Sequence, residues 1–136
     1  MDSEEIMLTV RITVAQRALL RRLAQGHRSD LSEVVSDGLL DILPTLHGQA
    51  RAYLLLAALT EPAPCALTVW LPGPLADLLQ PAANAVAGAT GVRLGSGSAM
   101  LGAALRLWLD QDPQLLAAHL DLMHAGRSSA APLVAA

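Results

Sequence analysis

Residues 8–13 read LTVRIT, and residues 67–72 in the middle of the chain read LTVWLP. Each copy alternates in polarity, is rich in β-branched residues and has the length of one strand. Each is followed by helical patterns, and no third segment has a strand pattern. A lone strand leaves its backbone hydrogen bonds unsatisfied. The repeat therefore predicts that the two strands pair with each other.

The composition is that of a globular helical protein. The chain has 136 residues, of which 53% are hydrophobic, 15% charged and 2% aromatic, and it lacks both phenylalanine and lysine. A core of Leu, Val and Ala favours closely packed helices. The single Cys65 excludes an internal disulfide. No apolar run is long enough to span a membrane, and the first residues are acidic, unlike a signal peptide. We therefore expect a cytoplasmic protein.

The expected elements divide the chain into four parts. Residues 1–43 form a first strand-helix-helix repeat, residues 44–64 a linking helix, residues 65–110 a divergent second repeat, and residues 111–136 a C-terminal helix with a frayed tail from Arg127. The strands are expected at about 6–12 and 65–71. Helices are expected at about 14–26, 30–43, 45–59, 75–89, 99–109 and 113–126.

Helix boundaries follow from capping and helix-breaking residues. Thr13, Ser29 and Ser98 are predicted N-caps, and Gly26 and Gly126 are predicted stops. Pro81 should kink or split the helix at 75–89. The predicted buried faces are listed here in chain order: Ala18, Leu19, Leu23 and Ala24; Val34, Val35, Leu39, Leu40 and Leu43; Leu115, Leu116, Leu120, Leu122 and Met123. Gln16, Arg17 and Arg21 should face outward.

The order strand, helix, tight turn, helix over residues 6–43 resembles the ribbon-helix-helix DNA-binding family of the Arc, MetJ and CopG type. The resemblance is carried by LTVRIT at 8–13, LLRRLA at 19–24 and RSDLSEV at 28–34. It implies a mostly α fold with a short two-stranded antiparallel ribbon. Two such repeats in one chain would form a pseudo-dimer, and a second copy of the chain could add a second ribbon. Alternatively, the first strand pairs with its counterpart in another chain, and the second repeat serves assembly only.

The resemblance also implies a site for double-stranded DNA. Period-two alternation places Met7, Thr9 and Arg11 on the face opposite Leu8, Val10 and Ile12. The family's ribbon enters the major groove, where Arg can contact guanine and Thr a thymine methyl group. The implied base-reading residues are Met7, Thr9, Arg11, Thr68 and Trp70. The implied phosphate contacts are Arg28, Ser29, Asp30, Arg93 and Ser98.

No pattern in the sequence predicts catalysis, a metal site or a cofactor. His119 and His124 are five residues apart and so lie on different helix faces. The segment GSGS at 95–98 lacks the lysine of a phosphate-binding loop, and Cys65 has no spaced histidine partner. We therefore expect a protein that is not an enzyme.

Two functions remain, and the outer ribbon face separates them. One is sequence-specific DNA binding by a nucleoid-associated repressor or autoregulator. The other is a helical module that binds protein, including a partner held by residues 113–136, as the net charge of −3 and the apolar second strand allow. DNA binding is favoured if Thr9, Arg11 and Thr68 share an exposed ribbon. Protein binding is favoured if helices cover Met7 and Trp70.

Overall fold

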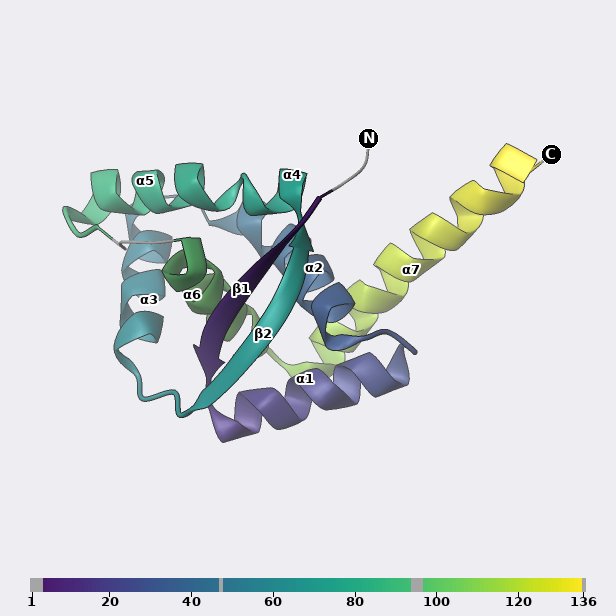
Figure 1. The fold of residues 1–136 in the computed structure, drawn as a ribbon, viewed down its shortest axis with the longest axis horizontal. Helices are drawn as coiled ribbons and strands as arrows, with labels where there is room; N and C mark the ends of the chain where they lie inside the picture. The colour runs from purple at the N-terminus through teal and green to yellow at the C-terminus, as the bar shows by residue number, and fades with distance from the viewer. Residues whose placement is uncertain (1–3, 47, 94–96, 136) are drawn as a thin grey trace.

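The two repeated segments pair with each other in one chain. β1 (Glu5–Ile12) and β2 (Cys65–Pro72) form a two-stranded antiparallel ribbon that crosses a set of helices (Figure 1). This computed structural model describes residues 4–46, 48–93 and 97–135, with side chains up to residue 126. The expected fold class, mostly α with one short β-ribbon, is confirmed.

The register of the ribbon shows that the repeat in the sequence is also a repeat in the structure. Thr9 lies opposite Thr68, Leu8 opposite Val69, and Val10 opposite Leu67. Thr9 and Thr68 are also the same position of the two aligned copies, so a pseudo-twofold axis passes between them. Their Oγ1 atoms lie 3.3 Å apart on that axis. Each step forward along one strand therefore lies opposite the same number of steps backward along the other.

Each strand leads into its own set of helices. The first unit continues with α1 (Val14–Gly26) and α2 (Leu31–Ile42), and the second with α4 (Gly73–Ala76), α5 (Leu79–Thr90) and α6 (Gly97–Leu109). The last helix of each unit packs beneath the other unit's strand: α2 under β2, and α6 under β1. These two helices also pack on each other. The two strand-then-helix units thus fit a tandem ribbon-helix-helix arrangement.

A third helix follows each unit and packs on the other unit. A short 3-10 turn η1 (Leu43–Thr45) leads into α3 (Gly48–Thr60), which packs on α5 and α6. In the same way α7 (Pro113–Ala135) follows α6 and packs on α2. Figure 1 shows α7 running out from the body of the molecule. The segments predicted as a linker and a C-terminal helix are therefore counterparts. No helix in the described ranges is long and apolar enough to cross a membrane.

The core lies between the inner face of the ribbon and the helices. Val10, Ile12, Val69 and Leu71 point into it, as the period-two pattern predicts. Trp108 of α6 is the largest fully buried side chain. Its indole Nε1 donates a hydrogen bond of 2.9 Å to Asp41 of α2.

Several predicted boundaries are wrong. α2 is capped by Asp30 and not Ser29, because the Asp30 carboxylate accepts from the Glu33 N–H while the Glu33 carboxylate accepts from the Asp30 N–H. α6 begins at Gly97, so Ser98 lies in its first turn and does not cap it. α3 begins three residues later than predicted, at Gly48.

Other predictions concerned glycine and proline. The helix at 75–89 is split as predicted, and the break lies before Pro81, because proline has no N–H to bond a carbonyl one turn earlier. Gly126 does not end α7, which continues to Ala135. One glycine inside a helix costs only about 1 kcal/mol.

The buried faces differ from prediction at several positions. Gln16 is buried, because it donates to Asp110 and accepts from the Thr13 N–H. Leu20 is buried and Ala18 is exposed, which shifts the buried stripe of α1 by one or two residues. Leu40, Leu115 and Leu122 are exposed, whereas Leu116 and Leu120 are buried.

Candidate nucleic-acid interface

The outer face of the ribbon carries all five residues that the sequence predicts to read bases. Met7, Thr9 and Arg11 of β1 lie opposite Trp70, Thr68 and Ala66 of β2, and all six side chains are exposed. No helix covers the two largest apolar ones, since Met7 is 56% exposed and Trp70 is 48% exposed. The observation expected to favour DNA over protein is therefore present: Thr9, Arg11 and Thr68 share one exposed ribbon.

The Arg11 end of the ribbon is rich in arginine. Arg11 donates a hydrogen bond of 3.3 Å to the Pro64 carbonyl and lines a cavity of about 280 Å³ with Ser98 and Arg106. Arg106 is only 3% exposed and donates to the Glu61 carbonyl at 2.9 Å. Its Nε has no partner among the described residues. Ser98 in the first turn of α6 therefore lines the same cavity as two guanidinium groups.

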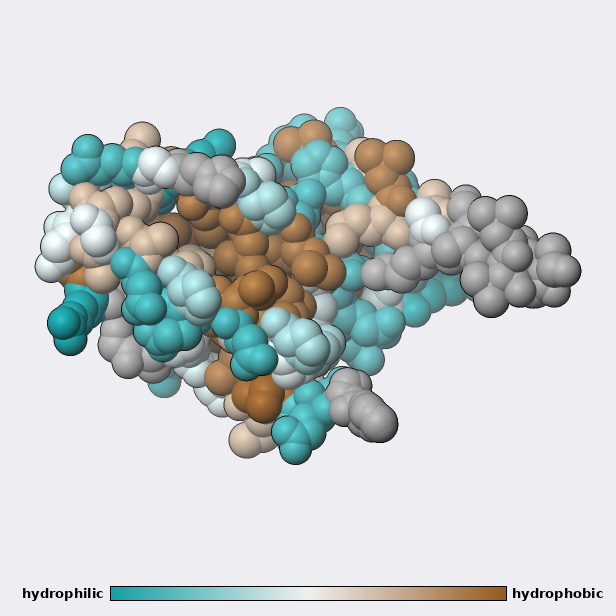
Figure 2. Space-filling view, turned by 90° about the horizontal axis from the view of Figure 1, so that it is seen from above, coloured by the Kyte–Doolittle hydropathy of each residue, from teal (hydrophilic) through white to brown (hydrophobic). Residues whose placement is uncertain are grey.

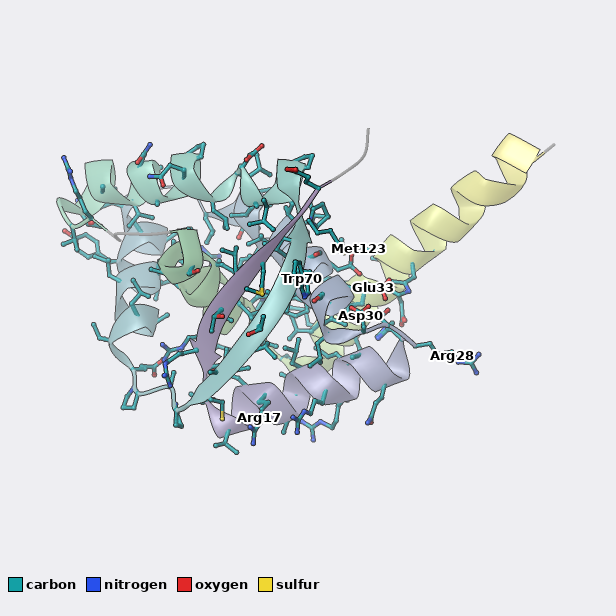
Figure 3. All side chains as sticks on the ribbon, in the orientation of Figure 1. Arg17, Arg28, Asp30, Glu33, Trp70 and Met123 are labelled. Carbon is teal, nitrogen blue, oxygen red and sulfur yellow. The ribbon has the colours of Figure 1, made fainter. Side chains whose placement is uncertain are left out.

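The Trp70 end of the ribbon is acidic instead. The Trp70 backbone N–H donates to the Ser32 hydroxyl of α2 at 2.9 Å, so this strand is fixed on the first turn of that helix. That turn carries Asp30 and Glu33 in the reciprocal capping arrangement. Figure 3 shows both carboxylates near Trp70, while Arg17 and Arg28 extend from the α1 side of the molecule. Two carboxylates at a helix N-terminus offset part of the positive end of the helix dipole and accept hydrogen bonds from N–H groups there.

The predicted phosphate contacts fall in separate places. Arg28, Ser29 and Asp30 are consecutive in the turn from α1 to α2, with Arg28 exposed at a left-handed φ of 53°. The Ser29 hydroxyl donates to the His27 carbonyl at 3.2 Å. Arg93 is exposed in the connection after α5, whereas Ser98 is half-buried beside Arg11. Ser98 lines one cavity together with Arg11, and Asp30 lines another together with Trp70.

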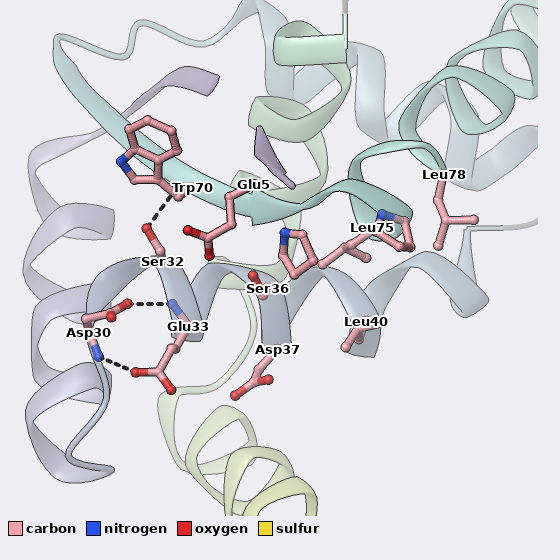
Figure 4. Close-up of a pocket in the computed structure, with 12 residues that line it drawn as sticks. Glu5, Asp30, Ser32, Glu33, Ser36, Asp37, Leu40, Trp70, Leu75 and Leu78 are labelled. Atoms are coloured by element: carbon pink, nitrogen blue, oxygen red, sulfur yellow. Dashed lines mark hydrogen bonds between the residues drawn. The ribbon is translucent and has the colours of Figure 1, made fainter. Parts of the chain in front are cut away.

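The sequence patterns did not predict a cavity at the Trp70 end of the ribbon. It has a volume of about 540 Å³ and lies between β2, α2 and α4, with Trp70 at its edge (Figure 4). Its lining comes from strand and helix positions up to 73 residues apart, from Glu5 to Leu78. No local sequence pattern predicts such a juxtaposition. Leu40, which the sequence predicts to be buried, is instead exposed and lines this cavity.

Three contacts between histidine and aspartate side chains attach α7 to the first unit. His27 Nε2 of α1 lies 2.8 Å from Asp121, His119 Nδ1 lies 2.7 Å from Asp41, and His124 Nε2 lies 3.5 Å from Asp37. Within the described residues no three His, Cys, Asp or Glu side chains are grouped as a metal site would need. The histidines therefore contribute to the packing of α7 on α1 and α2.

Comparison of the chain with protein-family models, with curated proteins and with solved structures finds no match in any of the three.

Proposed function

We propose that the chain is a sequence-specific DNA-binding protein of the repressor or autoregulator type, whose β-ribbon enters the major groove. One observation carries the proposal: a two-stranded ribbon presents Thr9, Arg11 and Thr68 on an exposed face while its other face forms the core. A two-stranded ribbon has the width that the major groove accepts. Arg11 supplies the bidentate donor for guanine, and the two threonines supply hydroxyl and methyl groups.

The charge distribution supports an orientation on DNA. Arg11, Arg106 and the first turn of α6 with Ser98 lie at one ribbon end, and the exposed Arg21, Arg22 and Arg28 lie on α1 and its following turn. In this proposal they and Arg93 contact phosphates. Asp30 and Glu33 repel phosphate at the Trp70 end. The backbone N–H groups of Ser29 and Asp30 already donate to the Ala24 carbonyl and to the Glu33 carboxylate, so they are not free to bind phosphate.

The first experiment is capture of fragmented genomic DNA on the purified chain, followed by sequencing of the retained fragments. A recurrent motif is expected, and its binding is then measured by fluorescence anisotropy with Arg11→Ala. Loss of the bidentate contact should cost about 1–3 kcal/mol at the specific site. Arg51→Ala on α3, outside the ribbon, is the matched control for lost positive charge. Equal binding by Arg11→Ala and the wild-type chain would remove Arg11 from the proposed interface.

A second candidate is a protein-binding module, favoured by the apolar surface at Met7 and Trp70 and by the net charge of −3. Exposed Leu115 and Leu122 of α7 extend this possibility to the segment 113–136. The same capture experiment separates the two functions. A folded chain that retains no DNA at moderate salt contradicts the DNA proposal and favours this one.

A further inference from the structure

The cavity at the Trp70 end of the ribbon has the size and walls of a small-molecule site. Its volume of about 540 Å³ lies within the range of about 300–1,000 Å³ that ligand pockets occupy. Leu40 of α2, Leu75 of α4 and Leu78 at the α4–α5 junction supply apolar walls. Leu40 is 47% and Leu78 48% exposed. Figure 2, which looks down on α4 and α5, shows apolar side chains gathered at the centre of that face.

The charged residues that line the cavity all have the same sign. Glu5, Asp30, Glu33 and Asp37 line it, and no Arg or His does. Asp37 is buried and lies 3.5 Å from His124, so it belongs to the contact with α7. Asp30 and Glu33 each use one carboxylate oxygen in the cap of α2, which leaves the other oxygen of each for a ligand. Glu5 makes no side-chain bond to another described residue, and Figure 4 shows it reaching from β1 toward α2.

We propose that this cavity binds an amphipathic organic amine. The apolar body of the ligand packs on the leucines, and its protonated nitrogen lies between Glu5 and Glu33. The indole of Trp70 at the rim adds an aromatic face, which attracts a cation within about 6 Å. An anionic ligand of the same shape is excluded by the carboxylates. The ligand class thus follows from complementary charge together with apolar walls.

The pseudo-twofold axis gives an internal comparison. A cavity about half as large lies at the other ribbon end, between β1 and α6, and its charged lining is Arg11, Arg106 and Glu61 in place of a wholly acidic set. An amine should therefore bind at one end only. The proposal does not depend on DNA binding, because ligand and chain are mixed without nucleic acid.

The test is a titration of the isotope-labelled full chain with phenethylamine, followed by amide and indole NMR signals. The chain has two tryptophans, of which Trp70 is exposed and Trp108 buried, and Trp70→Phe assigns their indole signals. We expect saturable shifts of the Trp70 indole and of amides in residues 32–40, with the Trp108 indole unchanged. Phenylacetate, which has the same ring and the opposite charge, should give no saturable shift.

Substitution of Glu5 and Glu33, the two carboxylates proposed to hold the amine, tests the charge directly. Glu5→Gln combined with Glu33→Gln should weaken phenethylamine binding by roughly threefold or more, as expected for the loss of exposed ion pairs. Glutamine at position 33 can still accept from the Asp30 N–H, so the cap of α2 is kept. Glu4→Gln removes a neighbouring charge outside the cavity lining and should bind as the wild type does. The proposal is overturned if phenylacetate binds equally, if the double variant binds as the wild type does, or if no saturable shift occurs at the Trp70 end.

Discussion

Arg28 occupies a backbone conformation that its side chain does not favour. Among the described residues it is the one non-glycine position with a positive φ, at 53°. A left-handed backbone costs an L-residue about 1–2 kcal/mol. The short turn from α1 to α2 requires it, since the Ser29 N–H bonds back to the Ala24 carbonyl at 2.9 Å. Gly26, the predicted stop of this helix, is its last residue, and His27 follows as the C-cap.

Arg28→Gly is expected to stabilise the chain by about 0.5–1 kcal/mol. Glycine removes the left-handed strain, and the greater freedom it adds to the unfolded chain offsets part of the gain. Urea unfolding followed by circular dichroism measures the change. Arg28→Ala separates strain from charge, because alanine loses the guanidinium but keeps the strained backbone. Equal stabilisation by both variants would contradict the explanation by strain.

Asp41 joins three elements through one carboxylate. Its Oδ2 accepts from the buried Trp108 Nε1 at 2.9 Å and lies 2.7 Å from His119 Nδ1 of α7. Asp41→Ala leaves the indole N–H unpaired and should cost about 1–3 kcal/mol in the free energy of unfolding. Asp41→Asn keeps an acceptor oxygen and should cost less. A smaller loss for alanine than for asparagine in denaturant unfolding would show that this bond does not stabilise the fold.

Residues whose role depends on local periodicity could be predicted from the sequence. The inner and outer faces of β1 follow from alternation, and both are confirmed. The choice of Asp30 over Ser29 as the cap depends on which backbone N–H each side chain reaches, and two adjacent capping residues give the same sequence signal. The burial of Gln16 depends on Asp110, which is 94 residues away in the chain.

At the scale of elements, the crossing of α2 and α6 depends on one glycine. A Cβ built on Gly38 would lie 2.7 Å from the ring of Trp108. Gly38→Ala should therefore destabilise the chain by about 1–3 kcal/mol, because overpacking against a buried ring outweighs the better helix propensity of alanine. Gly88→Ala on α5 is the matched control, since nothing lies within 4 Å of its added Cβ. It should stabilise the chain by up to about 1 kcal/mol. Thermal unfolding of both variants checks the opposite signs.

The elements of the repeat could be recognised from the sequence only where the two copies have clearly similar residues. The strands share Leu-Thr-Val, so their pairing could be predicted. α3 and α7 share only Leu-Leu-Ala-Ala, at 55–58 and 115–118, which is an ordinary helical string, and their common role of covering the other unit follows from packing. The acidic cavity was missed for the same reason. It forms where β2, α2 and α4 meet, and in the sequence each of its walls has the pattern of an ordinary strand or helix.

At the scale of the whole molecule, the backbone is nearly symmetric and the surface is not. The pseudo-twofold axis between Thr9 and Thr68 makes Trp70 the counterpart of Arg11. The first unit therefore presents a cation on the ribbon, and the second presents an indole. Under the proposed function the chain should recognise a site without a palindrome. The Arg11 half of the site is then read by hydrogen bonds, and the Trp70 half by apolar contact.

Trp70→Arg restores the symmetry of the ribbon and should change both affinity and sequence preference. A second arginine adds one cation to the outer face, so the plot of log K against log salt concentration should steepen by about one unit. The motif recovered by capture and sequencing should become more palindromic, because both halves then offer arginine to guanine. Trp70→Gln is the control that removes the indole without adding charge. If Trp70→Arg and Trp70→Gln bind DNA with the same affinity and the same salt slope, the Trp70 end of the ribbon lies outside the DNA interface, and a pseudo-symmetric ribbon would then read DNA at its Arg11 end alone.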